Sequence, residues 1–111
     1  MNTTCILLSI AKDFSATPGA RYIHEGPYSG EAFLTELLLP KFNEAIEAKC
    51  RLIVDLDGAE GFSTSFLEEA FGGLARVLYS SAKVLEVIDL KCEDEPYLID
   101  EIRAYIKKAN D

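Results

Sequence analysis

Apolar residues along the chain follow two repeats, one typical of strands and one typical of helices. Runs of β type occupy four segments, at residues 4–11, 22–25, 51–56 and 84–90. Apolar positions recur every three or four residues in three longer segments, which we expect to form amphipathic helices at residues 29–46, 66–80 and 96–108. Strands that alternate with such helices predict an α/β domain of order β-β-α-β-α-β-α, with helices packed on a mixed, mostly parallel sheet. Since no linker separates the segments, we expect one domain over residues 1–111.

Local signals refine the strand and the helix expected near the middle of the chain. The apolar run at residues 51–56 is uninterrupted and is closed by Asp57-Gly58, which is typical of a central strand buried on both faces. Ser29 stands at the expected N-cap of the first helix, and Pro40 lies inside that helix. Because proline lacks a backbone N–H and clashes with the preceding turn, we expect the helix to be kinked or split there.

Composition and charge narrow the classes of function. A chain of 111 residues with 49% hydrophobic content suits a single core. The 19 acidic residues outnumber the 11 basic ones, for a net charge of −8, and no basic run is present, so we do not expect a nucleic-acid ligand. No apolar stretch approaches the roughly 20 residues that span a bilayer, and the N-terminus has no leader pattern. We therefore expect a cytoplasmic protein that does not bind membranes.

A loop with three hydroxyls is the most informative feature of the sequence. The strand that ends at Gly58 leads through Gly61 and Phe62 to Ser63, Thr64 and Ser65, directly before the helix expected at residue 66. A helix N-terminus has free backbone N–H groups and about +0.5 of partial charge, so it favours a phosphoryl group or a docked partner. The alternative is purely structural, because Ser65 and Glu68 have the spacing of a capping box.

Motifs of catalysis give weaker signals. Asp55-Leu56-Asp57-Gly58 resembles the first motif of haloacid-dehalogenase-type phosphatases, but Ala59 stands where those enzymes have threonine. A turn at the end of a strand explains the same residues. His24 is the only histidine and has no partner at the spacing of a catalytic triad, and the glycine-rich turns lack the P-loop pattern. We expect no catalytic residue, no cofactor and no enzymatic activity.

The cysteines and a glycine pair complete the sequence signals. Cys5, Cys50 and Cys92 are unevenly spaced and lack the CxxC pattern, so we expect reduced, mostly buried thiols and no metal site. Gly72 and Gly73 lie inside an expected helix, where each glycine costs roughly 1 kcal/mol relative to alanine. Such a pair indicates close approach, either by a neighbouring element of the fold or by a partner on a flat patch.

Several of these motifs together resemble the STAS-like family of unknown function, a relative of sulfate-transporter and anti-sigma-factor-antagonist domains. The residues that carry the resemblance are Pro18-Gly19-x-Arg21, Gly26-Pro27-x-Ser29-Gly30-Glu31-x-Phe33, Val54-Asp55-Leu56-Asp57-Gly58 and Ser63-x-Ser65-Phe66-Leu67-x-Glu69-Ala70-Phe71-Gly72-Gly73-Leu74. The last of these runs is the most specific. The expected order of strands and helices is also that of a STAS domain.

The resemblance implies a regulatory role without catalysis. In the better-known antagonists a hydroxyl after the central strand is phosphorylated by a histidine-kinase-like ATPase, and on this chain that hydroxyl falls on Thr64. The acidic residue and the glycine of the antagonist loop are replaced by Ser63 and Phe66, so Ser63 and Ser65 remain alternative acceptors. The resemblance thus implies a module that binds such an ATPase through the loop and the helix after it. The expected contact residues are Asp57, Gly61, Phe62, Phe66, Glu69, Gly72 and Gly73.

A domain that senses a nucleotide or another small molecule is the alternative function. Its ligand would bind at the turns near Arg21 and Ser29. The sequence leaves the oligomeric state open.

Overall fold

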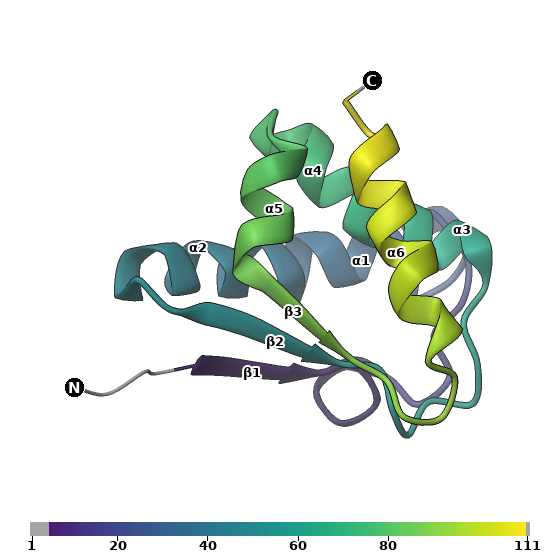
Figure 1. The fold of residues 1–111 in the computed structure, drawn as a ribbon. Coiled ribbons are helices and arrows are strands. Elements are labelled where there is room, and N and C mark those ends of the chain that lie inside the picture. Colours follow the sequence, from purple (N-terminus) through teal and green to yellow (C-terminus); the bar gives the residue numbers. More distant parts are fainter. Residues whose placement is uncertain (1–4, 111) are drawn as a thin grey trace.

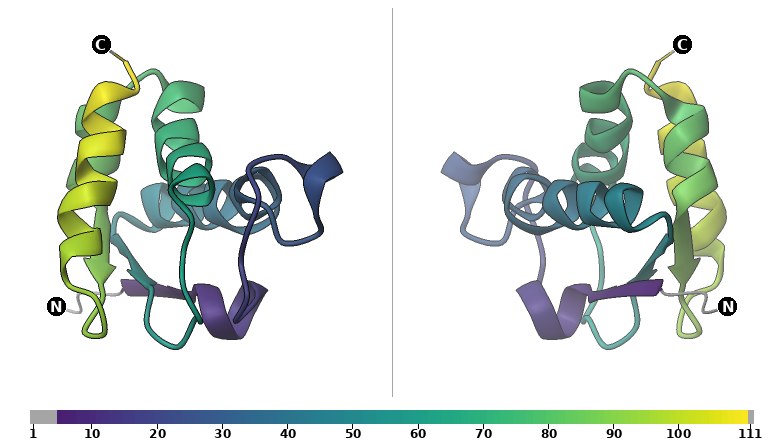
Figure 2. Two further views of the ribbon diagram at one scale, coloured as in Figure 1. Left: turned by 90° about the vertical axis from the view of Figure 1, so that its right-hand side faces the viewer. Right: turned by 90° about the vertical axis from the view of Figure 1, so that its left-hand side faces the viewer.

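The computed structural model describes residues 5–110, which form a three-stranded parallel sheet with helices on one side of it (Figures 1 and 2). The strands are β1 (Cys5–Ser9), β2 (Arg51–Asp55) and β3 (Ile88–Lys91). β2 lies in the centre, as the sequence predicted, with Leu8 and Leu90 on either side of Val54. The sheet of the described residues is therefore wholly parallel, whereas we predicted a mixed one.

The helices of this part of the chain form two long and two shorter units. They comprise α1 (Gly30–Phe33), α2 (Leu39–Ala48), α3 (Thr64–Leu67), α4 (Gly73–Leu78), α5 (Ser81–Val87) and α6 (Tyr97–Lys108). The π-helical segment Leu34–Leu38 joins α1 to α2, and the π-helical segment Glu68–Gly72 joins α3 to α4. A further π-helical turn, Ile10–Phe14, follows β1.

Pro40 changes the hydrogen bonding of the first long helix without splitting it. It lies at the start of α2, directly after the π-helical segment. The N–H of Leu39 donates to the carbonyl of Leu34, five residues back. Since Pro40 has no N–H to offer, the wider π turn accommodates the missing bond and the helix continues to Ala48.

The strand predicted at Tyr22–Glu25 is wrong, because the segment Ile23–Glu25 is a short 3-10 helix. The Glu25 carboxylate accepts hydrogen bonds from the backbone N–H groups of Arg21 (3.1 Å) and Tyr22 (3.0 Å). Glu31 accepts from the N–H of Ile23 at 2.9 Å. These side chains satisfy the donors that a strand would have paired with a neighbour. The order, with the long helices counted as units, is β-α-β-α-α-β-α.

The strand predicted at residues 84–90 is also wrong over its first half, which belongs to α5. Ser80 caps this helix by accepting from the N–H of Lys83 at 3.1 Å. Val84 and Val87 lie about one turn apart and are both buried, so their apolar character serves a helix face rather than a strand. The strand itself covers only Ile88–Lys91.

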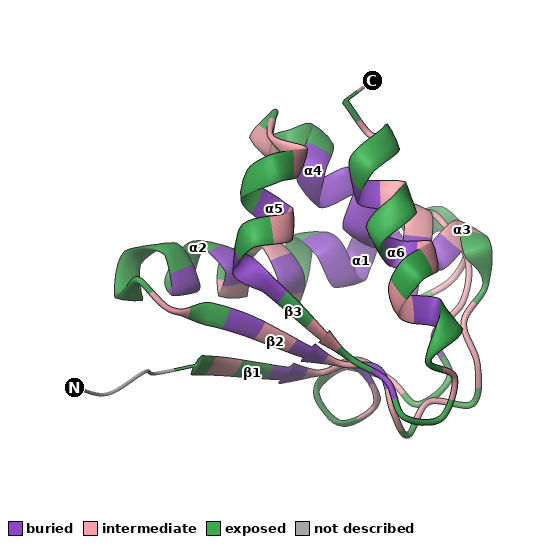
Figure 3. Ribbon diagram, in the orientation of Figure 1, coloured by how far each residue is buried: buried purple, intermediate pink, exposed green. Residues whose placement is uncertain are grey.

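The core lies between the inner face of the sheet and the helices (Figure 3). Its aromatic centre consists of Phe33 and Phe66, whose ring centroids are 5.8 Å apart, with Phe71 at 6.4 Å from Phe33. The two long helices touch where Gly30 meets the backbone carbonyl of Phe66. This contact fixes where the N-terminus of α3 lies relative to the start of α1.

Within residues 5–110, no element covers the other face of the sheet. Leu7 on that face is 70% exposed, Arg51 and Asp89 are exposed, and Ile53 is half-buried. The central strand was predicted to be buried on both faces, and the structure covers only one. No helix within residues 5–110 is long and apolar enough to cross a bilayer.

The three thiols differ in exposure, and thiol reagents should distinguish them. Cys5 is exposed, against our prediction of mostly buried thiols, while Cys50 is half-buried and Cys92 is buried. Burial raises the pKa of the Cys92 thiol. Because the thiolate is the reactive form, we expect Cys5 to react first and Cys92 last with a chromogenic disulfide. Cys5→Ser should remove the fast phase, and a fast phase that persists in this variant would contradict the arrangement.

Candidate functional site

Two aspartates fix the loop that carries the hydroxyls. Asp55 ends β2 and accepts from the backbone N–H of Asp57 at 2.9 Å. The Asp57 carboxylate accepts from the backbone N–H groups of Glu93 (2.8 Å) and Asp94 (2.9 Å), which follow β3. These bonds hold the pKa of Asp57 below its usual value, and the bond from the N–H of Asp94 contributes most. Asp55 therefore closes the turn after its own strand, and Asp57 anchors that turn to the segment that follows β3.

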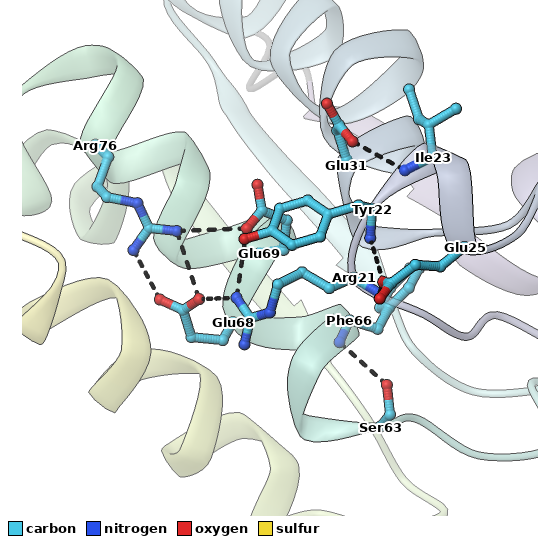
Figure 4. A network of polar contacts seen from close by, with 10 residues as sticks. All are labelled: Arg21, Tyr22, Ile23, Glu25, Glu31, Ser63, Phe66, Glu68, Glu69 and Arg76. Atoms are coloured by element: carbon cyan, nitrogen blue, oxygen red, sulfur yellow. Dashed lines mark hydrogen bonds and ion pairs between the residues drawn. The ribbon is translucent and has the colours of Figure 1, made fainter.

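The three hydroxyls of the loop have different environments. Ser63 is the N-cap, and its Oγ accepts from the N–H of Phe66 at 3.1 Å (Figure 4). The capping box predicted for Ser65 and Glu68 is therefore wrong, and the helix begins two residues earlier than predicted, at Thr64. Thr64 is exposed and Ser65 is half-buried. Within residues 5–110 neither of these two hydroxyls makes a hydrogen bond.

Substitutions should separate the capping hydroxyl from its neighbour. Ser63→Ala removes the cap and should lower the free energy of unfolding by about 1 kcal/mol. Thr64→Val keeps the shape of an exposed side chain and should change that free energy by less than about 0.5 kcal/mol. Urea unfolding followed by circular dichroism measures both. Equal losses in the two variants would contradict the assignment of Ser63 as the cap.

Four charged side chains form a cluster just after the loop, three of them from the second long helix and one, Arg21, from the earlier segment (Figure 4). Arg21 Nη1 lies 2.5 Å from Glu68 Oε1 and 3.4 Å from Glu69 Oε1. Arg76 Nη1 lies 2.7 Å from Glu68 Oε2. The hydrogen bond from Arg76, with a further contribution from Arg21, holds the pKa of Glu68 below its usual value despite partial burial. Two guanidinium groups thus balance two carboxylates, and Arg21 ties its own segment to the second long helix.

The segment that supplies Arg21 is held in one shape by its own backbone. The N–H of Gly19 donates to the carbonyl of Tyr28 at 2.9 Å, and the N–H of Gly30 donates to Ala20 at 3.1 Å. The N–H of Glu31 donates to Arg21 at 2.9 Å. The two arms of the segment therefore run side by side into α1. Arg21 is presented by a braced turn rather than by a free loop.

The braced turn and the hydroxyl loop meet at one shallow, open hollow. Its lining residues are Ala20, Arg21, Tyr22, Glu25, Ser63 and Ser65. Tyr22, which lines the hollow, is 41% exposed, and the next residue in the chain, Ile23, is 51% exposed. Ser29, which we placed near a ligand, is instead fully buried and caps α1 by accepting from the N–H of Ala32 at 3.0 Å. Tyr22 and Glu25 were not predicted as site residues, because their only sequence signal is an aromatic residue in a turn-rich segment.

Several residues predicted to contact a partner lie in the interior instead. Phe66, Gly72 and Gly73 are buried. A Cβ on Gly73 would lie 2.8 Å from Leu34 Cδ2, and one on Gly72 would lie 2.8 Å from Glu68 Oε2. This favours tight packing, the first of the two explanations for the glycine pair. The remaining predicted residues, Asp57, Gly61, Phe62 and Glu69, are half-buried.

Comparison with known families shows to which protein family this chain belongs. A family model described as a STAS-like domain of unknown function matches residues 29–97. The chain belongs to the STAS-like family. No curated protein and no solved structure matches it.

The hollow combines residues inside the family match with residues that precede it. The hydroxyl loop, Glu68 and Glu69 lie inside the matched residues, whereas Arg21 and Tyr22 precede them. The motif Pro18-Gly19-x-Arg21, which we quoted for the resemblance, thus lies outside the match. Arg21 is nonetheless bound to the matched part through Glu68.

The hollow of the STAS-like domain presents groups that can recognise a ligand or a partner. Among the described residues, no three His, Cys, Asp or Glu side chains are placed to hold a metal ion. His24 is exposed and stacks on Tyr22, with ring centroids 5.7 Å apart. The lining residues supply a guanidinium, a carboxylate, an exposed aromatic side chain and serine hydroxyls. Such groups can bind a protein surface or an anion.

Acid should weaken the STAS-like domain through its hydrogen-bonded carboxyls. Glu25, Asp57 and Glu68 have pKa values below the ordinary 4.5 of Glu and 3.8 of Asp, because backbone N–H groups or Arg76 stabilise their charged forms. The stability that these carboxylates contribute to the fold is fully present at pH values above their ordinary pKa values. It is lost as the pH falls through the lowered pKa values of the folded state. We therefore expect the melting temperature to fall below pH 4.5. Glu68→Gln should lower it at pH 7 and flatten the acid profile, and an unchanged profile would contradict this.

Proposed function

We propose that this STAS-like domain is a non-enzymatic regulatory module that binds a protein partner through its switch surface. We define the switch surface as the hydroxyl loop, residues 61–65, together with the braced turn, residues 20–25. The observation that carries the proposal is that these two segments, some 40 residues apart in sequence, line one hollow whose lining includes the exposed Tyr22. Exposed aromatic side chains on a rigid support are typical anchors of protein interfaces.

The resemblance to anti-sigma-factor antagonists suggests a histidine-kinase-like ATPase as the partner. Membership of the STAS-like family supports a regulatory module in general, and the choice of partner rests on the resemblance. The surface is open and shallow, and it presents a guanidinium, a carboxylate and two hydroxyls. A protein surface with a complementary acidic and polar rim suits it better than an apolar ligand does.

Phosphorylation of Thr64 is the switch that we propose for this surface. The γ-phosphoryl group of ATP would move to Thr64 Oγ1, ADP would leave, and the hydroxyl proton would pass to a base of the partner. Ser63 and Thr64 are both exposed, but the Ser63 hydroxyl is occupied as the cap, which leaves Thr64 as the exposed hydroxyl without that role. The new group adds about −1.5 to −2 charge. Because Glu68 and Glu69 already engage both arginines, the added charge repels these carboxylates and favours release of the partner.

Photo-crosslinking in the cell tests the partner directly. A photoreactive phenylalanine analogue at Tyr22 replaces one exposed aromatic side chain with another and leaves all three hydroxyls intact. The matched control puts the same residue at Tyr79, which is 89% exposed at the end of α4. We expect an adduct from Tyr22, but not from Tyr79, with a protein that carries an ATP-binding domain. No adduct at Tyr22, or the same adducts at both positions, would contradict the proposal.

The hollow also favours the second candidate, a domain that senses a nucleotide or another small anion. Arg21 with Ser63 and Ser65 provides a cation and hydroxyls around one concave surface. A ligand that binds the folded state raises the melting temperature as its concentration rises. A thermal-shift screen with nucleotides and inorganic anions would support this candidate if Arg21→Met abolished the rise. No rise with any of them would reject it.

A further inference from the structure

The open face of the sheet conflicts with the sequence of its own strands. All-parallel sheets are normally covered on both faces, and their strands then read as continuous apolar runs. β1 and β2 have such runs, yet Leu7 is 70% exposed and Ile53 is only half-buried. β3 instead alternates apolar and charged residues. A missing cover centred on β1 and β2 would explain both patterns.

The charges of this open face differ from those of the rest of the molecule. The register of the strands places Leu7 beside Ile53 at its centre and four charged residues around them. Arg51 Nε lies 3.7 Å from Asp89 Oδ2, and Lys91 Nζ lies 3.7 Å from Asp55 Oδ2. These two cations and two carboxylates on the strands sum to zero, whereas the chain carries a net charge of −8. Beyond the strand ends, Lys91 Nζ also lies 3.9 Å from Asp57 Oδ2 and 4.0 Å from Glu93 Oε2, so that end of the face is acidic.

We propose that a second copy of this chain covers the open face. Two molecules of charge −8 repel each other over most of their surfaces. The strand residues of the open face have an apolar centre and charges of both signs that sum to zero, so this part of the face can meet its own copy around a two-fold axis without net repulsion. Leu7 and Ile53 of each copy then lose their exposure to water. This proposal is independent of the switch surface, because no residue of the open face lines the hollow.

Light scattering after size exclusion, over a range of concentrations, tests the dimer. We expect wild type to be a dimer in the micromolar range and Leu7→Glu to raise the dissociation constant by about tenfold or more. Val77→Glu is the matched control, since it replaces an aliphatic residue that is 51% exposed on α4, away from the sheet. A wild-type monomer would overturn the proposal and leave the face to a different protein. Equal weakening by Val77→Glu would overturn it as well.

A mixing experiment tests whether the two faces meet. Arg51→Asp makes the open face negative and Asp89→Arg makes it positive, and both positions are exposed, so the fold should tolerate each change. We expect each variant alone to be weakened as a dimer and an equal mixture to form a mixed dimer, detected by native mass spectrometry. If the mixture forms no more mixed dimer than chance pairing gives, the proposed interface is wrong.

Discussion

Replacing Gly30 with alanine should destabilise the domain by about 1–3 kcal/mol or more. An added Cβ would lie 2.5 Å from the backbone carbonyl oxygen of Phe66, which cannot move without shifting the second long helix. Replacing glycine with alanine in a helix normally raises the free energy of unfolding by about 0.5–1 kcal/mol. A decrease at position 30 would therefore indicate the steric clash with the Phe66 carbonyl. Urea unfolding followed by circular dichroism gives the free energy.

Gly19→Ala is the matched control for this experiment. Nothing lies within 4 Å of a Cβ at position 19, so its free energy of unfolding should stay within about 0.5 kcal/mol of wild type. If Gly30→Ala were as stable as wild type, the close contact between α1 and α3 would be wrong. The placement of the braced turn against the hydroxyl loop would then lose its main support.

Phe66→Ala should cost about 3–5 kcal/mol of unfolding free energy. Phe66 is fully buried and its ring lies within 6.3 Å, centroid to centroid, of Phe14, Phe33 and Phe62. Truncation removes an aromatic side chain and leaves a cavity beneath the N-terminus of α3. Thermal and urea unfolding should both report the loss.

The control for Phe66→Ala is Tyr79→Ala, which truncates an aromatic residue that is almost wholly exposed. Its effect should remain within about 0.5 kcal/mol. A small effect of Phe66→Ala would contradict the buried position of this side chain and would favour the sequence-based prediction that Phe66 contacts a partner. A large effect would confirm that Phe66 belongs to the core that packs against the hydroxyl loop.

Sequence patterns predicted the parts of the fold in which local preference and tertiary packing agree. The central strand of residues 51–55 and the helix of residues 97–108 are examples, because each has a strong period and clear ends. The strand expected at residues 22–25 failed because Glu25 and Glu31 satisfy its backbone donors. Its β-type composition carried no sign of those bonds.

The candidate site was predicted only in part, for a similar reason. The hydroxyl loop is a local feature, visible as three hydroxyls between a strand and a helix. The contact between Arg21 and Glu68 joins residues that are 47 positions apart, so no local sequence pattern predicts it. The hollow exists only because that contact and the packing of Gly30 on Phe66 bring the two segments together.

Site-resolved mass spectrometry of the protein recovered from its own cells tests the central claim most directly. Peptides that cover residues 61–67 would be compared across growth conditions. The proposal predicts phosphate on Thr64, in a fraction that changes with conditions, and none on the capping Ser63. A loop that is unmodified under every condition would contradict a phosphorylation switch at this surface.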